Sequence, residues 1–123
     1  MTQAAVLASN ASLMTTPSGT APGYMARAWV NFNGTGTVAI RASGNVSSIT
    51  DNGTGDYTVN FTTAMSDANY AANCSTVYNS STRESVTFFV GTPSTTAIRV
   101  VTGYTYTSPG AIDTAYMYVA IFR

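Results

Sequence analysis

Short runs in which apolar and polar side chains alternate at every second residue, bounded by Gly and Asn, most constrain this chain. In the clearest run, residues 56–62, an aromatic or aliphatic side chain alternates with Asp, Thr or Asn. Because successive side chains of a strand point to opposite faces, this run predicts a strand with one apolar face. The preceding Asn52-Gly53 pair accepts positive φ at low cost and predicts a chain reversal. Residues 27–70 therefore predict a β-meander.

The same two-residue period recurs along most of the chain. Residues 63–69 support at most one turn of helix, with Ser66 and Asp67 as turn or cap residues. We expect strands at residues 26–33, 37–43, 46–50, 56–62, 70–78, 85–90, 97–102, 104–107 and 115–122. About eight or nine strands at this close spacing predict an all-β fold, an antiparallel β-sandwich or a jelly roll.

The first predicted strand has two different faces. Ala28, Val30 and Phe32 share one face, and Trp29 lies on the opposite face together with Arg27. A tryptophan in a sandwich is most often part of the core, and the alternative is an exposed platform in an interface or ligand site.

The last predicted strand, AYMYVAIF at residues 115–122, is apolar on both faces. Such a run is typical of a strand covered on both sides, either within its domain or between subunits. The eight tyrosines of the chain fit core and subunit packing, and the alternative is contact with a glycan.

Charge is scarce in this sequence. Only 8% of the residues are charged, Lys and His are absent, and the net charge is zero. A globular domain more usually carries about 25% charged residues, so Ser, Thr and Asn must face water here. The arginines are spread singly, which excludes a nucleic-acid partner because phosphate binding needs clustered cations. A net charge near zero favours self-association.

The missing residue types also narrow the chemistry. Without His and Lys, the commonest general base and metal ligand are absent, and Cys74 has no activating partner. We interpret Cys74, the single cysteine, as a small buried side chain. Asp51 and Asp56 flank one turn, which favours turn capping over a weak calcium site or a catalytic pair of carboxylates. The sequence predicts no enzyme, no metal and no cofactor.

Residues 1–23 show no sustained period, and their composition alone is typical of a disordered tail. Val6, Leu7, Leu13 and Met14 favour the alternative, an extended arm that docks on a neighbouring chain. We therefore expect an arm at residues 1–23 and one β-sandwich domain at residues 24–123. Because no signal peptide and no span of about 20 apolar residues is present, we expect a soluble chain made in the cytoplasm without membrane insertion.

The sequence of residues 27–70 resembles that of a known protein module. RAWVNFNGTGTVAIRASGNVSSITDNGTGDYTVNFTTAM followed by SDANY closely resembles a module of phage virion proteins, notably at the distal ends of tail fibres and tailspikes. The resemblance covers residues 27–70 and is looser elsewhere. It implies a compact β-sandwich that works as a homotrimer on a phage particle.

The place on the particle follows from what surrounds the module. The chain has no heptads and no repeat, and an arm of 23 residues spans about 80 Å at most. A module without a shaft fits a capsid decoration (cement) protein, which as the resemblance implies sits as a trimer on the outer capsid surface, stabilises the shell, and has the major capsid protein as its partner. Host surface polysaccharide is a further candidate partner. The alternative is the receptor-binding distal tip of a tail fibre or tailspike.

Two sets of residues are candidates for contacts in such an assembly. The first set belongs to the arm and is expected against the capsid or the adjoining subunit: Val6, Leu7, Leu13 and Met14. The second set belongs to the last strand and is expected at the trimer seam: Tyr116, Tyr118 and Phe122.

Overall fold

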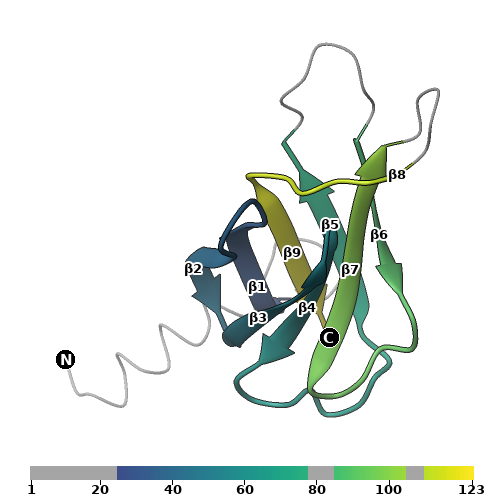
Figure 1. Cartoon of the computed structure of the whole chain (residues 1–123). Coiled ribbons are helices and arrows are strands. Elements are labelled where there is room, and N and C mark those ends of the chain that lie inside the picture. Colours follow the sequence, from purple (N-terminus) through teal and green to yellow (C-terminus); the bar gives the residue numbers. More distant parts are fainter. Residues whose placement is uncertain (1–24, 78–84, 105–109) are drawn as a thin grey trace, which may run out of the picture.

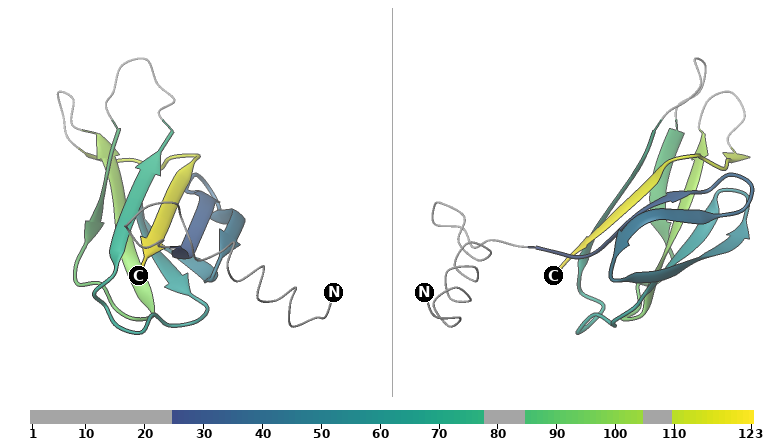
Figure 2. Two further views of the ribbon diagram at one scale, coloured as in Figure 1. Left: turned by 180° about the vertical axis from the view of Figure 1, so that it is seen from behind. Right: turned by 90° about the vertical axis from the view of Figure 1, so that its left-hand side faces the viewer.

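The computed structural model describes residues 25–77, 85–104 and 110–123, and within these ranges the chain forms two antiparallel sheets packed face to face (Figure 1, Figure 2). The predicted all-β sandwich is therefore confirmed. Its strands are β1 (Ala26–Asn33), β2 (Ala39–Gly44), β3 (Val46–Gly53), β4 (Asp56–Phe61), β5 (Ala71–Thr76), β6 (Ser85–Val90), β7 (Ala97–Tyr104), β8 (Gly110–Ala111) and β9 (Met117–Phe122).

One sheet has the strand order β2-β1-β9-β5, and the other has the order β3-β4-β7-β6 with β8 paired to β7. Hairpins join β1 to β2, β3 to β4 and β6 to β7, each within one sheet. A jelly roll instead interleaves two Greek keys, so the jelly-roll part of the prediction is wrong. Short turns such as the one after Gly53 lead a strand back beside its predecessor within these hairpins.

The predicted strand boundaries hold closely, with differences at a few ends. β1 and β6 have the predicted bounds, whereas β2 begins at Ala39 and β9 begins at Met117, both two residues late. β7 runs on to Tyr104, where a separate strand was predicted to begin, and residues 105–109 lie outside the described ranges. The short strand β8 was not predicted, because its two residues carry no alternation.

No turn of helix forms at residues 63–69, which is within the prediction of at most one turn. The Met65 amide donates to the carbonyl oxygen of Thr95 at 2.8 Å, so a neighbouring loop takes a donor that a helical turn would use. Asp67 is a turn residue, as predicted, because its Oδ1 accepts the amide of Asn69 at 2.8 Å.

The core lies between the two sheets and follows the alternation. Ala28, Val30 and Phe32 of β1 are buried, as their shared face predicted. Full burial of a side chain such as Val30 or Phe32 contributes about 1.5–3 kcal/mol. The opposing and neighbouring strands contribute Tyr57, Val59, Phe61, Ile98, Val100, Met117, Val119 and Ile121.

One end of the sandwich is organised around the phenol of Tyr57. The side chain is fully buried, and its hydroxyl oxygen lies 2.8 Å from both the carbonyl oxygen of Gly34 and Oδ1 of Asp113. The Gly55 amide donates to the same carboxylate oxygen at 2.7 Å. A Cβ at Gly34 would lie 2.5 Å from the hydroxyl oxygen, so glycine is needed for this approach. The three loops at this end are thereby tied to one side chain.

We predict that Tyr57→Phe lowers the free energy of unfolding by about 1–3 kcal/mol, because Asp113 and Gly34 lose a buried donor while the ring stays in place. Urea unfolding of the full chain measures this change. In a double-mutant cycle with Asp113→Ala, the two effects should couple by at least about 0.5 kcal/mol. Additive effects would contradict the shared hydrogen bond.

Candidate functional site

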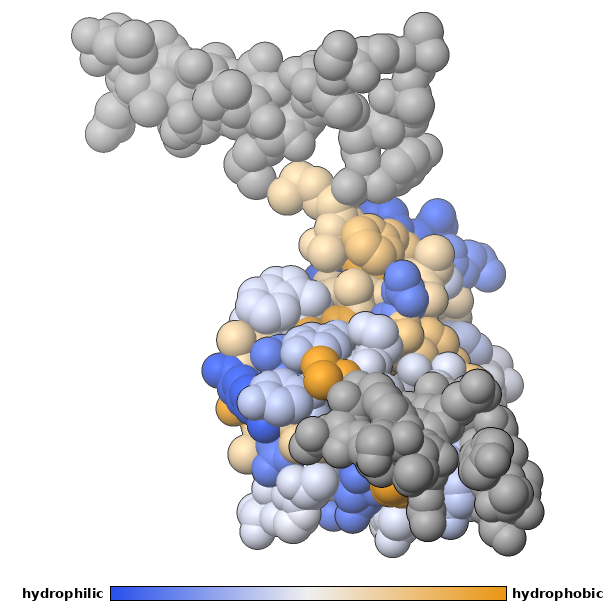
Figure 3. Space-filling model, turned by 90° about the horizontal axis from the view of Figure 1, so that it is seen from above, coloured by the Kyte–Doolittle hydropathy of each residue, from blue (hydrophilic) through white to orange (hydrophobic). Residues whose placement is uncertain are grey.

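The two outer faces of the sandwich differ in chemistry. On β3 and β4 of one sheet, the outward side chains are polar and form hydrogen bonds with one another. Asn60 Nδ2 donates to Ser48 Oγ at 3.1 Å and to Thr50 Oγ1 at 2.9 Å. Viewed from above, the described surface mixes blue, pale and orange side chains (Figure 3). On β3 and β4, the groups that face water include neutral amides and hydroxyls, as the composition predicted.

An ion pair extends this polar face toward the turn after β3. Arg99 binds the carboxylate of Asp56 through Nε, at 2.8 Å, and through a second guanidinium nitrogen. Asn52 Nδ2 donates to the same carboxylate and to Thr58 Oγ1 at 2.9 Å. The Arg99 guanidinium lowers the pKa of the Asp56 carboxyl below its usual value. The polar groups here satisfy one another within the chain, so this face offers few free donors or acceptors to a partner.

The three residues considered as catalytic or metal-binding groups, Asp51, Asp56 and Cys74, have surroundings typical of structural residues. Asp51 Oδ1 accepts the Gly53 amide at 2.9 Å, which confirms turn capping, whereas Asp56 pairs with Arg99. Burial raises the pKa of the half-buried Cys74 thiol, which therefore stays protonated. Across the described ranges, no three His, Cys, Asp or Glu side chains cluster as metal ligands do.

The outer face of the other sheet, β2-β1-β9-β5, is aromatic. We call it the aromatic face and define it by Trp29, Tyr116, Tyr118 and Phe122. Trp29 is 44% exposed, Tyr116 42% and Phe122 38%, and Tyr118 is half-buried. A core position for Trp29, the more common alternative, is therefore wrong. The alternation that buries the preceding and following residues of β1 turns this indole outward.

A shallow groove of about 390 Å³ crosses the aromatic face. The register places Trp29 beside Ala120, and Ala120 lies between Tyr118 and Phe122 along β9. A methyl group among three rings leaves a depression. The buried amide oxygen of Asn31, which also lines the groove, has no hydrogen-bond partner in the described part of the chain. This face thus has exposed rings and an unsatisfied polar atom where the opposite face has paired polar groups.

A β-bulge directs Arg41 onto one end of the aromatic face. Asn31 pairs with Ala42 and Phe32 with Ile40, so Arg41 is an extra residue on β2. Its guanidinium carbon lies 4.2 Å from the centroid of the Tyr116 ring. At an exposed site such a cation–π contact is worth about 0.5–1 kcal/mol. The stacked guanidinium orders the ring of Tyr116 at the edge of the face.

Gly44 decides where the indole of Trp29 lies. The two residues are paired across β1 and β2, and a Cβ at Gly44 would lie 2.4 Å from Nε1 of Trp29. The indole therefore rests against the backbone of β2, in space that any larger residue would occupy.

The structure brings some of the predicted contact residues together. Tyr118 and Phe122 line the same groove, and Tyr116 lies at the end of the face beneath Arg41. Sequence reasoning did not place Trp29 in this set, although its phase relative to Ala28 and Val30 is the signal that marks it as outward. No described element covers the outward side chains of β9, so covering by a second subunit stays a prediction. The predicted arm residues Val6, Leu7, Leu13 and Met14 lie outside the described ranges.

No family model matches this chain, and no curated protein and no solved structure matches it. The resemblance of residues 27–70 to phage virion modules therefore stays a prediction from sequence. Among the residues that the structure describes, no helix is long and apolar enough to cross a membrane.

We predict that Gly44→Ala displaces the indole of Trp29, because the added methyl group would overlap it. Trp29 is the single tryptophan, so the intrinsic fluorescence spectrum reports its surroundings directly. We expect the fluorescence emission maximum of Trp29 to shift and the free energy of unfolding to change. The matched control Ser43→Ala alters the neighbouring exposed residue of β2 and should leave the spectrum unchanged. Identical spectra for all three proteins would contradict the contact.

Proposed function

We propose that this protein is a phage capsid decoration protein without enzymatic activity, a homotrimer that binds the outer capsid surface and stabilises the shell. The observation that carries the proposal is the contrast between the two outer faces. Over β3 and β4, the outward side chains of one face are joined by internal hydrogen bonds, whereas the other face exposes Trp29, Tyr116 and Phe122. The resemblance of residues 27–70 supplies the setting, a phage particle.

The chemistry of the aromatic face suits a contact between subunits. Interface cores are enriched in Trp, Tyr and Phe and depleted in charged residues. Of the charged side chains that the structure describes, Arg41 alone is recorded in contact with a ring of this face. We therefore assign the trimer seam to Tyr116, Tyr118 and Phe122, with Trp29 added to it. In a threefold assembly each aromatic face would meet a different surface of the next subunit, because such contacts are heterologous.

Shell stabilisation then follows from linkage. A protein that binds the assembled shell and not its separated parts lowers the free energy of the assembled state by its binding free energy. The partner in this proposal is the major capsid protein. The predicted arm at residues 1–23, with Val6, Leu7, Leu13 and Met14, is the proposed contact with the capsid or the adjoining subunit.

A second function, the receptor-binding tip of a tail fibre or tailspike, is favoured by one observation. The groove beside Ala120 combines three aromatic rings with the polar side chains of Asn73 and Ser75. Rings that stack on a sugar, next to amide and hydroxyl groups that bond its hydroxyls, are what a site for neutral host polysaccharide needs.

We predict that replacing both Tyr118 and Phe122 with Ser dissociates the trimer, because the seam loses two aromatic contacts. Light scattering of the purified chain measures the molar mass. Phe88→Ser is the matched control, since Phe88 is 50% exposed but lies on β6 of the other sheet. The proposal fails if the unaltered protein is a monomer, or if the double variant keeps the molar mass of the trimer.

We predict a copy number in purified phage particles that is comparable with that of the major capsid protein. Threefold positions recur over the whole shell, whereas a fibre tip is present in few copies. Quantitative mass spectrometry of intact particles gives the ratio of the two proteins. A ratio typical of tail components would favour the receptor-binding tip instead.

A further inference from the structure

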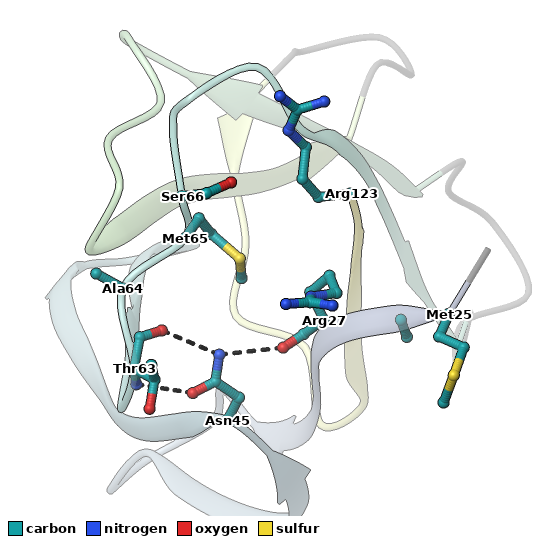
Figure 4. A pocket seen from close by; sticks show the side chains of 9 residues that line it. Met25, Arg27, Asn45, Thr63, Ala64, Met65, Ser66 and Arg123 are labelled. Atoms are coloured by element: carbon teal, nitrogen blue, oxygen red, sulfur yellow. Dashed lines mark hydrogen bonds between the residues drawn. The ribbon is translucent and has the colours of Figure 1, made fainter. Parts of the chain in front are cut away.

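We propose a second binding site at one end of the sandwich, a pocket that binds the carboxylate of an acidic sugar through Arg27. The pocket has a volume of about 630 Å³ and lies between the start of β1, the corner at Asn45 and residues 63–66 (Figure 4). The inference deepens the proposed function, on which it rests for its setting, because a phage surface meets bacterial envelope polysaccharide.

A β-bulge sets the position of Arg27 at this pocket. Ala26 pairs with Phe122 and Ala28 pairs with Ile121, so Arg27 is an extra residue on β1. Simple alternation would place it on the face of Trp29, as the sequence predicted. Figure 4 instead shows its guanidinium projecting into the opening of the pocket. Bulges that re-aim a side chain are over-represented beside functional sites.

Asn45 holds the two walls of the pocket together. Its Nδ2 donates to the carbonyl oxygens of Arg27 and Thr63, both at 3.0 Å, and its Oδ1 accepts the Thr63 amide at 2.7 Å (Figure 4). The residue has a φ of 55°, which a non-glycine residue seldom adopts. Because both amide hydrogens are used, Asn45 is a positioning residue. It ties the bulged residue to the opposite wall.

Arg27 is not neutralised within the described part of the chain. Neither ion pair there involves it. Each described aspartate already has a partner elsewhere: Asp51 with Gly53, Asp56 with Arg99, Asp67 with Arg123, and Asp113 with Gly55 and Tyr57. At the rim of the pocket, Arg123 is held by Asp67, which leaves Arg27 as the cation available to an anionic ligand.

The remaining lining suits a sugar. A guanidinium presents parallel N–H donors that match a carboxylate, and such charge-assisted hydrogen bonds are strong. Thr63 and Ser66 add hydroxyl groups, and Met25 and Met65 add apolar contact for the face of a ring. The opening is compact and lies at the end of the sheets, whereas an acidic peptide would more readily add along a strand edge. A hexuronate combines the carboxylate, the hydroxyls and the ring that this lining matches.

The test is an NMR titration of the full-length, ¹⁵N-labelled protein with glucuronate. We expect progressive shifts of the Thr63 and Met65 amide signals, a dissociation constant in the millimolar range, and weaker binding as salt is added. Glucose should cause no comparable shifts. Arg27→Gln should weaken binding roughly tenfold or more, with an unchanged unfolding midpoint because the side chain is exposed.

Arg99→Gln is the matched control, since it removes an exposed arginine that lies outside the pocket and on the other sheet, and it should leave glucuronate binding intact. Equal binding of glucose, or full binding by Arg27→Gln, would overturn the site. Acetate that binds as tightly as glucuronate would overturn its assignment to a sugar, and binding of a polyglutamate peptide in place of glucuronate would assign it to an acidic protein. The oligomeric state of the same samples separates the two proposals. A trimer that does not bind glucuronate contradicts only the proposed pocket, and a monomer that binds glucuronate contradicts only the proposed trimer.

Discussion

The structure depends on β1 being held between β2 and β9. This strand contributes Ala28, Val30 and Phe32 to the core and Trp29 to the aromatic face, so the alternation of one segment supplies both sides of the sheet. Its pairing with β9 joins residues nearly the whole described chain apart, such as Ala26 and Phe122. Closing so long a loop is entropically expensive, so the sheet is stable only when the core packs at the same time.

Two departures from this regular pairing determine where two arginine side chains lie. The two bulges that flank the centre of β1 insert Arg27 and Arg41, and each directs an arginine that forms no ion pair in the described chain. One guanidinium stacks on Tyr116 at the aromatic face, and the other projects into the end pocket. The arginines in regular or terminal positions, Arg99 and Arg123, are paired with acids. Irregular backbone therefore separates cations that stabilise the fold from cations that are available to a partner.

The outer faces of the two sheets differ in how their side chains are satisfied. The amides and hydroxyls on the outer face of β3 and β4 form hydrogen bonds with neighbours in the same chain, so few of them are free to bind another copy. This matters because a net charge of zero gives almost no electrostatic repulsion between copies. The rings of the aromatic face are exposed, and the small side chain of Ala120 leaves a groove between them. In the proposed function, a neutral chain with one exposed aromatic face would assemble in a defined orientation, as an ordered lattice on a shell requires.

The sequence alone determined the class of fold, most strand positions and the buried face of β1, because a period of two residues is a local property of a strand. It also identified Tyr118 and Phe122 as outward residues of an apolar strand. It left the exposure of Trp29 open between two alternatives, and it did not reveal the strand order or the position of Arg27. Those depend on which strands become neighbours and where a bulge interrupts the phase, and such matters are decided by packing between segments far apart in the chain. The pocket at Asn45 is the clearest case, since its walls come from the start of β1, the residue after β9 and two turns that meet only after the sheets have closed.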